Sequence, residues 1–189
     1  LDASSDGKIY GSTYSADNGK AFVYDIDSGE FTDLGIAKEG QDYVRGGGVS
    51  DNYFYAGIGT TAHLIRYDRK TLEKIEIELP ITGAKSSISD IFAYGGKLFL
   101  VGGSRMTIMD EETHEILHEI TGGSLYSFDS MISPPSPHDE SLIYFRNRRD
   151  SRIWTYNTQA DEFKIATGAP ILPNLAVKGM GWVELKDGP

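Results

Sequence analysis

The chain lacks cysteine, long hydrophobic runs and any excess of basic residues. Without cysteine, disulfides, thiol nucleophiles and thiolate metal sites are excluded, although the cellular compartment stays undecided. No apolar run approaches the roughly 18 residues that a membrane-spanning helix needs, and no basic region followed by an apolar one opens the chain. A formal net charge of -10 argues against broad nucleic-acid binding, because such binding rests on neutralising phosphates. We therefore expect neither a nucleic-acid partner nor a membrane span.

Helical periodicity is also scarce in this chain. What is present instead is a series of short runs rich in Val, Ile, Leu, Tyr and Phe, separated by Gly, Asp and Asn. Such runs are typical of β-strands, and the small residues between them supply the positive φ angles that hairpin turns need. With 189 residues, of which 39% are hydrophobic, the chain is expected to form one all-β domain over residues 1–189.

Two markers recur along the chain with one period. Tyr-Asp, Tyr-Asp, Met-Asp and Tyr-Asn pairs begin at residues 24, 67, 109 and 156, so their spacings are 43, 42 and 47. Turn pairs that begin at residues 6, 51, 95 and 139, each followed by a strand, have spacings of 45, 44 and 44. Four short strands in about 44 residues form the blade of a β-propeller. We predict blades at 1–35, 44–80, 86–122 and 125–168, since a β-sandwich would not explain why both markers recur in step.

The two ends of the chain fall inside units of this pattern. Residues 1–4 resemble the end of a first strand, and residues 174–189 resemble the first strand of a further or closing blade. We expect part of a larger propeller, and the alternative is a closed four-bladed ring. Because open sheet edges pair with other chains, self-association is expected if the ring is incomplete.

The first repeat has a recognisable residue pattern. Residues 6–10 are Asp-Gly-Lys-Ile-Tyr, and an apolar strand that ends at Tyr24-Asp25 leads into Ser28-Gly29-Glu30. This pattern resembles bacterial β-propeller repeats of the quinoprotein-like and kelch-like kind, and the resemblance implies a fold and no chemistry. The Trp that ends quinoprotein repeats is missing after residue 30, so no quinone cofactor is expected. The Gly-His and Trp-Asp pairs of WD repeats are missing as well.

Blade topology sorts the loops into two sets. Turns between the first and second strands and between the third and fourth strands lie at one end of a blade. Loops between the second and third strands, and between blades, lie at the other end. The second set is longer and carries six of the eight arginines, namely Arg45, Arg105, Arg146, Arg148, Arg149 and Arg152. Because functional residues concentrate on loops above a rigid scaffold, we expect the functional site at this second end.

The arginine-rich loops predict an anionic ligand. A guanidinium group presents a planar fork that matches carboxylate and phosphate, and neighbouring tyrosines can stack on sugar rings. We predict a binding module or scaffold for an anionic carbohydrate, another anionic small molecule or a protein partner, in an extracellular or periplasmic location, with a cytoplasmic one left open. In the alternative, the arginines pair with Asp and Glu of neighbouring blades. The predicted ligand-binding residues are Arg45, Arg105, Tyr126, Arg146, Arg149 and Lys178.

An enzyme of the polysaccharide-lyase type is the alternative function. Arg45 or Arg105 would neutralise a uronate carboxylate and so acidify the adjacent C–H group. Tyr43 or His63 would then act as the base. This hypothesis requires all four side chains to converge in one pocket.

Two metal-like motifs are not expected to bind metal. The segment from His114 to His118 matches the zinc-protease pattern, but that chemistry needs a helix. In register with the other repeats, residues 113–115 form a turn and Ile116 begins a strand, on which histidines four positions apart would lie about 13 Å apart. The acidic turn from Asp25 to Glu30 lacks the further oxygen ligands of a calcium loop. We therefore predict no metal and no cofactor.

Overall fold

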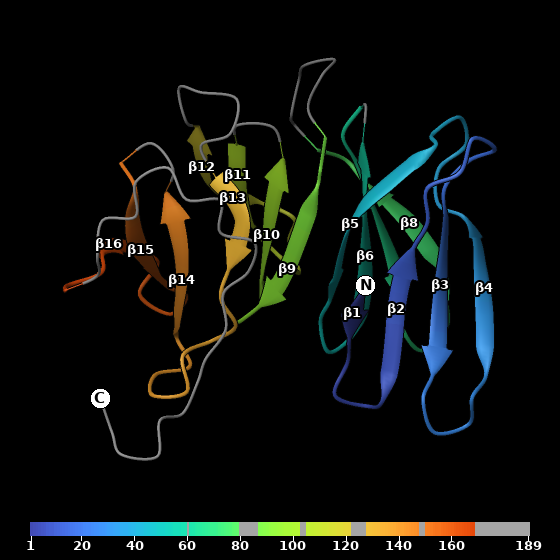
Figure 1. Cartoon of the computed structure of the whole chain (residues 1–189), viewed down its shortest axis with the longest axis horizontal. Coiled ribbons are helices and arrows are strands. Elements are labelled where there is room, and N and C mark those ends of the chain that lie inside the picture. Colours follow the sequence, from blue (N-terminus) through green and yellow to red (C-terminus); the bar gives the residue numbers. More distant parts are fainter. Residues whose placement is uncertain (60, 80–86, 103–104, 122–127, 148–149, 169–189) are drawn as a thin grey trace. The chain divides into compact units, whose positions relative to one another are not determined.

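The computed structural model describes residues 1–59, 61–79, 87–102, 105–121, 128–147 and 150–168, and all of its regular elements are strands (Figure 1). No helix long and apolar enough to cross a membrane occurs in these ranges. The strands form four sheets of four strands each. The chain divides into a first unit, Leu1–Glu119, and a second unit, Ile120–Pro189, and each is described by itself.

Every sheet is an antiparallel meander in which each strand pairs with the next one along the chain. Blade 1 contains β1 (Asp2–Ala3), β2 (Lys8–Ser12), β3 (Lys20–Asp25) and β4 (Phe31–Ile36). Blade 2 contains β5 (Tyr43–Val49), β6 (Tyr53–Gly59), β7 (His63–Asp68) and β8 (Lys74–Ile77). Blade 3 contains β9 (Asp90–Tyr94), β10 (Lys97–Gly102), β11 (Arg105–Asp110) and β12 (Ile116–Thr121). Blade 4 contains β13 (Phe128–Ile132), β14 (Leu142–Asn147), β15 (Arg152–Asn157) and β16 (Glu162–Ile165).

These sheets confirm the prediction of four repeated blades. The predicted closing strand at residues 174–189 lies outside the described residues.

The turns that carry the two sequence markers are hydrogen-bonded to each other in each of the four blades. The residue after the marker Asp or Asn donates its backbone N–H to a carbonyl of the turn between the first two strands. The pairs are Ile26 to Gly7 (3.0 Å), Arg69 to Asn52 (2.9 Å), Glu111 to Gly96 (3.0 Å) and Thr158 to Ser141 (2.8 Å). This bond is kept although the segments between the two turns differ in length from blade to blade, so it holds the two turns together at one end of each blade.

The turn between the third and fourth strands has one conformation in all four blades. The side chain of the first turn residue accepts hydrogen bonds from the backbone N–H groups two and three positions further along the chain. This first residue is Asp25, Asp68, Asp110 or Asn157. The fifth residue has a positive φ, and it is Gly29 (71°), Leu72 (62°), His114 (61°) or Asp161 (55°). His114 therefore lies in a turn and β12 begins at Ile116, which confirms that this segment is not the helix a zinc protease requires.

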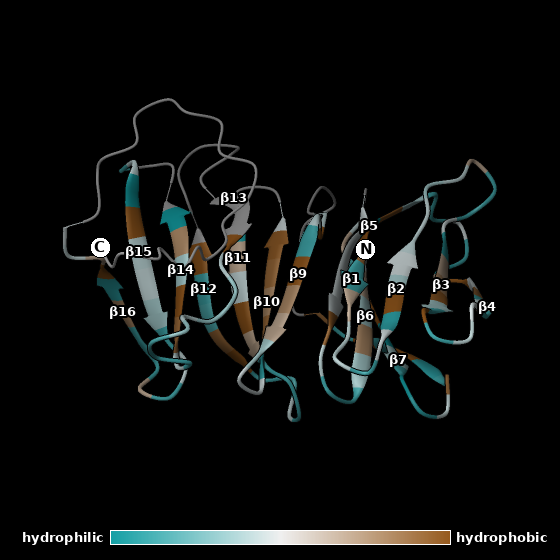
Figure 2. Ribbon diagram, turned by 60° about the horizontal axis from the view of Figure 1, so that its bottom comes forward, coloured by the Kyte–Doolittle hydropathy of each residue, from teal (hydrophilic) through white to brown (hydrophobic). Residues whose placement is uncertain are grey.

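Neighbouring blades of the first unit pack face to face. Successive residues of a strand point to opposite faces, so Tyr10, Ala21 and Val23 of blade 1 meet Phe54 and Tyr67 of blade 2 in one hydrophobic core. A second core joins blades 2 and 3 and contains Tyr55, Leu64, Ile77, Ile91, Leu98, Leu100 and Met109. Figure 2 shows hydrophobic residues concentrated on strands such as β10, and hydrophilic residues in the turns.

Glycines on β5 allow blade 3 to approach blade 2. A Cβ atom added at Gly48 would lie 2.7 Å from the carbonyl oxygen of Ile91 on β9, and one added at Gly46 would lie 3.1 Å from the Ile91 side chain. Gly47 points to the other side of the strand, where the nearest atom is at 3.6 Å. The glycine run is therefore explained by backbone packing.

Candidate functional site

The loops of the first unit gather at two ends, as the blade topology predicts. The short turns are joined by the hydrogen bonds described above. At the other end, the loop between β2 and β3 meets the connection from blade 1 to blade 2, where Tyr14 and Tyr43 form an isolated antiparallel bridge. Backbone bonds from Ser15 to Asp42 (3.1 Å) and from Gly19 to Gln41 (2.8 Å) hold the two segments together.

Tyr14, Tyr43 and Arg45 form a layered surface at this end, which we call the tyrosine–arginine platform. The rings of Tyr14 and Tyr43 stack with centroids 4.4 Å apart and an interplanar angle of 29°. The guanidinium carbon of Arg45 lies 4.8 Å from the centroid of the Tyr43 ring. Tyr14 is 64% exposed, and Arg45 is exposed as well. The Tyr43 side chain raises the pKa of Tyr14, so its phenol is neutral at physiological pH.

A β-bulge places Arg45 on this platform. On β5, Val44 pairs with Ile58 and Gly46 pairs with Gly57, so Arg45 is the extra residue without a partner in the ladder. Bulges bend a strand and redirect a side chain. A Cβ atom at Gly59 would lie only 3.3 Å from Cδ of Arg45, so the arginine stem runs along a position where β6 has no side chain.

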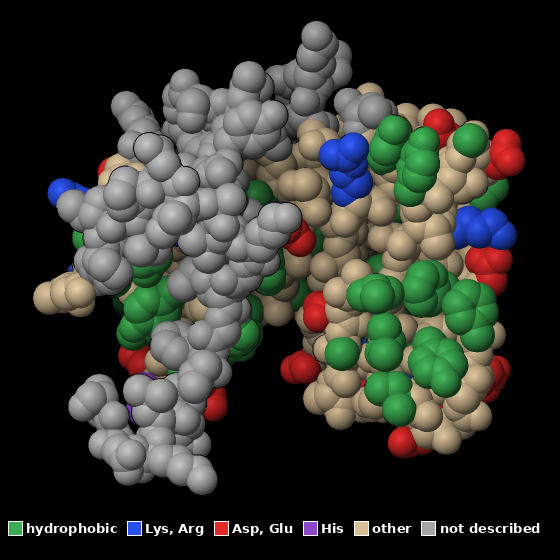
Figure 3. Space-filling view, viewed as in Figure 1, with side chains coloured by type: hydrophobic (Ala, Val, Ile, Leu, Met, Phe, Trp, Pro, Cys, Tyr) green, Lys and Arg blue, Asp and Glu red, His purple; other side chains and the backbone are tan. Residues whose placement is uncertain are grey.

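Arg45 is an exposed positive charge. On the face of the first unit that Figure 3 draws, acidic side chains are scattered and Lys and Arg side chains are few. Among the described residues, no carboxylate forms a salt bridge with Arg45. Its charge is therefore available to a ligand.

Two other predicted residues pair with carboxylates. Nδ1 of His63 lies 2.6 Å from Oε1 of Glu76, and Lys38 contacts the other oxygen of that carboxylate at 2.5 Å. The Lys38 ammonium, and then His63, lower the pKa of Glu76. Nε of Arg105 lies 3.3 Å from Oε1 of Glu119. For Arg105, the structure thus shows the paired state that was the alternative to ligand binding.

The remaining predicted residues belong to the second unit or to its undescribed parts. Arg146 lies on β14 and is only 3% exposed, and its ligand-binding role stays a prediction. Tyr126, Arg149 and Lys178 lie outside the described residues.

The lyase hypothesis receives no support. Of the four side chains that it needs, Tyr43 and Arg45 contact each other, whereas His63 and Arg105 are engaged by glutamates. None of the four lines any of the three cavities described in the first unit.

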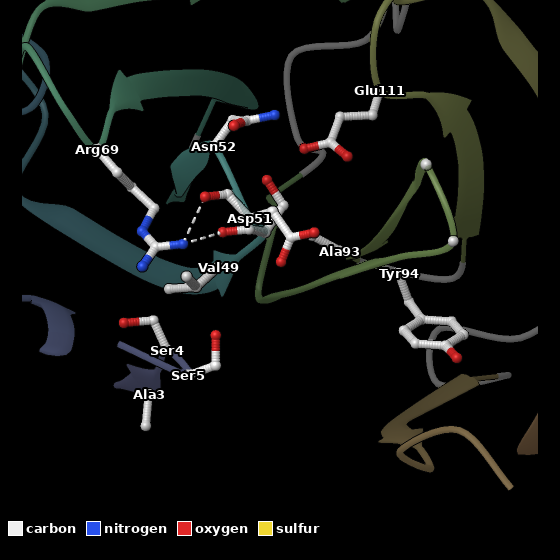
Figure 4. A pocket seen from close by; sticks show the side chains of 13 residues that line it. Ala3, Ser4, Ser5, Val49, Asp51, Asn52, Arg69, Ala93, Tyr94 and Glu111 are labelled. Carbon is white, nitrogen blue, oxygen red and sulfur yellow. Dashed lines mark hydrogen bonds between the residues drawn. The ribbon is translucent and has the colours of Figure 1, made fainter. Parts of the chain in front are cut away.

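A cavity lies at the opposite end of the first unit (Figure 4). It has a volume of about 440 Å³, and the turns before β2, β6 and β10 form its walls. Figure 4 shows polar side chains around it, among them Asp51, Asn52 and Glu111. The sequence did not point to this cavity, because each turn by itself is short and ordinary and the hollow forms only where three turns meet.

Arg69 closes one side of this cavity and ties blade 1 to blade 2. Its Nη1 donates to the carbonyl oxygens of Ser50 and Asp51 at 2.7 Å each, and its Nε donates to the Tyr10 hydroxyl at 3.3 Å. Its Nη2 lies 2.6 Å from Oδ1 of Asp6. Because the guanidinium is engaged on every side, its role is structural.

Comparison with known proteins supports the fold and nothing finer. The chain is similar to BamB from Moraxella catarrhalis, with 17% identity and a TM-score of 0.50 over 80% of this chain and 47% of that chain. It is also similar to AztD from Citrobacter koseri, with 16% identity and a TM-score of 0.51 over 88% of this chain and 44% of that chain. Both are β-propellers.

The chain has the β-propeller fold. The chain spans less than half the length of either solved structure, namely 47% of BamB and 44% of AztD. At these identities the likeness is one of fold alone. No protein family profile matches the sequence, and no curated protein matches it. The quinoprotein-like and kelch-like details of the repeat stay predictions.

Proposed function

We propose that the protein is a β-propeller binding module whose tyrosine–arginine platform holds an anionic carbohydrate. The observation that carries this proposal is the exposed stack of Tyr14 on Tyr43 with the Arg45 guanidinium beside it. The face of an aromatic ring is negative, and the C–H groups of a sugar ring are slightly positive, so the two attract each other. A uronate carboxylate or a sulfate on the same sugar matches the planar fork of Arg45.

The charge of the chain explains why Arg45 would be decisive. A formal net charge of -10 repels a polyanion at long range. We expect an acidic sugar to bind only where a cation that is not paired with a protein carboxylate offsets this repulsion. Among the described residues, Arg45 is exposed, contacts the Tyr43 ring and has no such carboxylate partner.

Calorimetry with a panel of uronate oligosaccharides and their neutral methyl esters tests the proposal. Tyr14→Ala removes the exposed ring and should weaken binding of both forms about three- to tenfold. Arg45→Gln keeps the stem but removes the charge, so it should weaken binding of the acidic form alone. Lys70→Gln removes one positive charge from an exposed turn at the opposite end and should leave both affinities unchanged. Equal losses for Arg45→Gln and Lys70→Gln would contradict the proposal.

An acidic segment of a protein partner is the other ligand that these side chains suit, because tyrosine and arginine are enriched at interface hot spots. Failure of every acidic oligosaccharide to bind, together with capture of acidic peptides that depends on Arg45, would favour this second function. An extracellular or periplasmic location stays a prediction from the sequence.

A further inference from the structure

The cavity drawn in Figure 4 has the size of a small-molecule site. Its volume is about 440 Å³, within the range of roughly 300 to 1,000 Å³ that is typical of ligand pockets. The turns that follow β1, β5 and β9 line it, together with the first residue after β11. Ligands bind most often in such a hollow, where several loops meet above a rigid scaffold. The chemistry of the lining decides which ligand fits.

Two polar side chains that line this cavity have no partner in the protein. Asp51 and Asn52 form the turn between β5 and β6, and both are exposed. Arg69 holds this turn in place, because it donates to the Asp51 carbonyl at 2.7 Å from Nη1 and to the Asn52 carbonyl at 2.9 Å from its backbone N–H. Within the part of the chain that the structure describes, no hydrogen bond or ion pair engages the Asp51 carboxylate or the Asn52 side-chain amide. Both groups are available to a ligand.

A buried tyrosine orients a second carboxylate at the cavity. The Tyr55 hydroxyl donates to Oε1 of Glu111 at 3.0 Å, and Tyr55 is 0% exposed. The backbone N–H of Glu111 donates to the Gly96 carbonyl at 3.0 Å, which fixes the start of its turn. Figure 4 shows the Glu111 carboxylate pointing toward the turn that carries Asp51. In the ranges that the structure describes, no cation forms an ion pair with Glu111.

The nearby arginines do not neutralise these two carboxylates. Arg69 lines the cavity, but its guanidinium is engaged as described above and its charge is paired with Asp6 at 2.6 Å. The Arg66 guanidinium lies 4.2 Å from the centroid of the Tyr53 ring, and its Nη1 lies 3.3 Å from Nε2 of His114. The cavity therefore presents an excess of negative charge. Because the whole chain carries a formal net charge of -10, it also attracts cations at long range.

We propose that this cavity binds a small organic cation, whose ammonium or guanidinium group pairs with Asp51 and Glu111. Bonds from a charged N–H donor to a carboxylate are about twice as strong as neutral ones, and the amide oxygen of Asn52 accepts a further N–H. The apolar body of the ligand packs against Val49 and Ala93, which also line the hollow. This site lies at the opposite end of the first unit from the tyrosine–arginine platform and does not depend on the function proposed for it.

An organic cation suits this lining better than a metal ion does. No group of three or more His, Asp or Glu side chains that could hold a metal occurs in the described part of the chain. A calcium ion takes six to eight oxygen ligands, whereas an ammonium group has three N–H donors to satisfy.

Titration of the isotope-labelled protein with cadaverine and with benzylamine, followed by the chemical shifts of its backbone amides, tests the proposal. Both amines should shift the amides of Asn52, Gly95 and Gly96 saturably, with dissociation constants of about 1 mM or below. Pentane-1,5-diol and benzyl alcohol have the same carbon skeletons without the charge. They should bind at least about tenfold more weakly.

Two variants remove one carboxylate charge each. Asp51→Asn and Glu111→Gln should each raise the dissociation constant of cadaverine about tenfold, because each removes one charge-assisted bond. Glu111→Gln keeps an oxygen that accepts from Tyr55, so the wall of the cavity is retained. The matched control is Glu112→Gln, which removes the same charge from an exposed side chain outside the lining. Since water and salt screen this charge, the control should change the dissociation constant less than about twofold.

Several outcomes would overturn the proposal. One is the absence of a saturable shift with either amine up to about 10 mM. Another is an equal loss for Glu111→Gln and Glu112→Gln, or equal binding of the amines and the alcohols. Calcium chloride that shifts the same amides at a lower concentration than cadaverine would replace the organic cation with a metal ion. An acetylated peptide with a single lysine that binds at least about tenfold more tightly than cadaverine would replace the small molecule with a protein partner.

Discussion

Replacing Arg69 with methionine tests whether its guanidinium ties blade 1 to blade 2. In the native protein, this group donates to the carbonyls of Ser50 and Asp51, pairs with Asp6 and donates to the Tyr10 hydroxyl. The side chain is only 10% exposed. Methionine retains much of the packing of the arginine stem and removes every donor, so the variant isolates the polar contacts from the apolar ones.

The magnitude follows from the exposure of each partner. Hydrogen bonds from a charged donor contribute about 1.5 to 3 kcal/mol when shielded, and Arg69 makes two such bonds to carbonyl oxygens at 2.7 Å each. The ion pair contributes at most about 1 kcal/mol, because the Asp6 carboxylate is 49% exposed and screened by water. We expect Arg69→Met to lower the free energy of unfolding by about 3 to 4 kcal/mol, a large part of the stability of an ordinary domain.

Equilibrium urea unfolding followed by far-UV circular dichroism measures this loss. Asp6→Asn removes only the ion pair and should cost less than about 1 kcal/mol. Arg69→Lys should restore little of the stability, since one ammonium group cannot span two carbonyls and a carboxylate as the planar fork does. The combination of Arg69→Met with Asp6→Asn should be hardly less stable than Arg69→Met alone.

Two results would refute this reasoning. If Asp6→Asn destabilises as much as Arg69→Met, the ion pair to blade 1 provides the stabilisation and the two carbonyl bonds within blade 2 do not. If Arg69→Met leaves the urea midpoint unchanged, water replaces the guanidinium at no cost, and the tie between the blades is apolar packing alone.

Three further perturbations test the repeat itself. Gly48→Ala should cost about 1 to 3 kcal/mol in urea unfolding, because its methyl group would meet the backbone of β9, whereas Gly47→Ala should be tolerated. Burial, and then a nearby arginine, lower the pKa of His114 from 6.5, so the unfolded chain binds more protons than the folded one. Melting temperatures should therefore fall as the pH decreases from 6.5 through that lowered pKa, and His114→Asn should reduce this slope. Asp110→Asn should be nearly neutral in thermal melts, since Asn157 accepts the same two bonds in blade 4, and Asp110→Ala should cost about 1 kcal/mol. Equal losses for the two variants would show that the charge of this carboxylate matters and its acceptor geometry does not.

The tyrosine–arginine platform shows how far the sequence could lead to a site. Tyr43 and Arg45 were predicted from the arginine-rich loops, and Tyr14 lies on a loop at the same predicted end. Their contacts depend on a bridge between two loops and on a bulge at Arg45. Neither has a local sequence signal, because a bulge arises from the register with the partner strand. For the same reason, the sequence did not show that His63 and Arg105 meet glutamates.

The strands, the turns and their period could be predicted from local residue patterns. Each hairpin closes through short-range bonds, such as the two that Asp68 accepts, so the necessary information lies within a few residues of each turn. Which apolar positions are covered depends on the packing of one blade against the next. Tyr24 and Tyr67 precede the same marker aspartate in two repeats, yet Tyr24 is 37% exposed and Tyr67 is 1% exposed. The difference arises because blade 1 packs against the face that carries Tyr67, and burial depends on that neighbour and not on the residue.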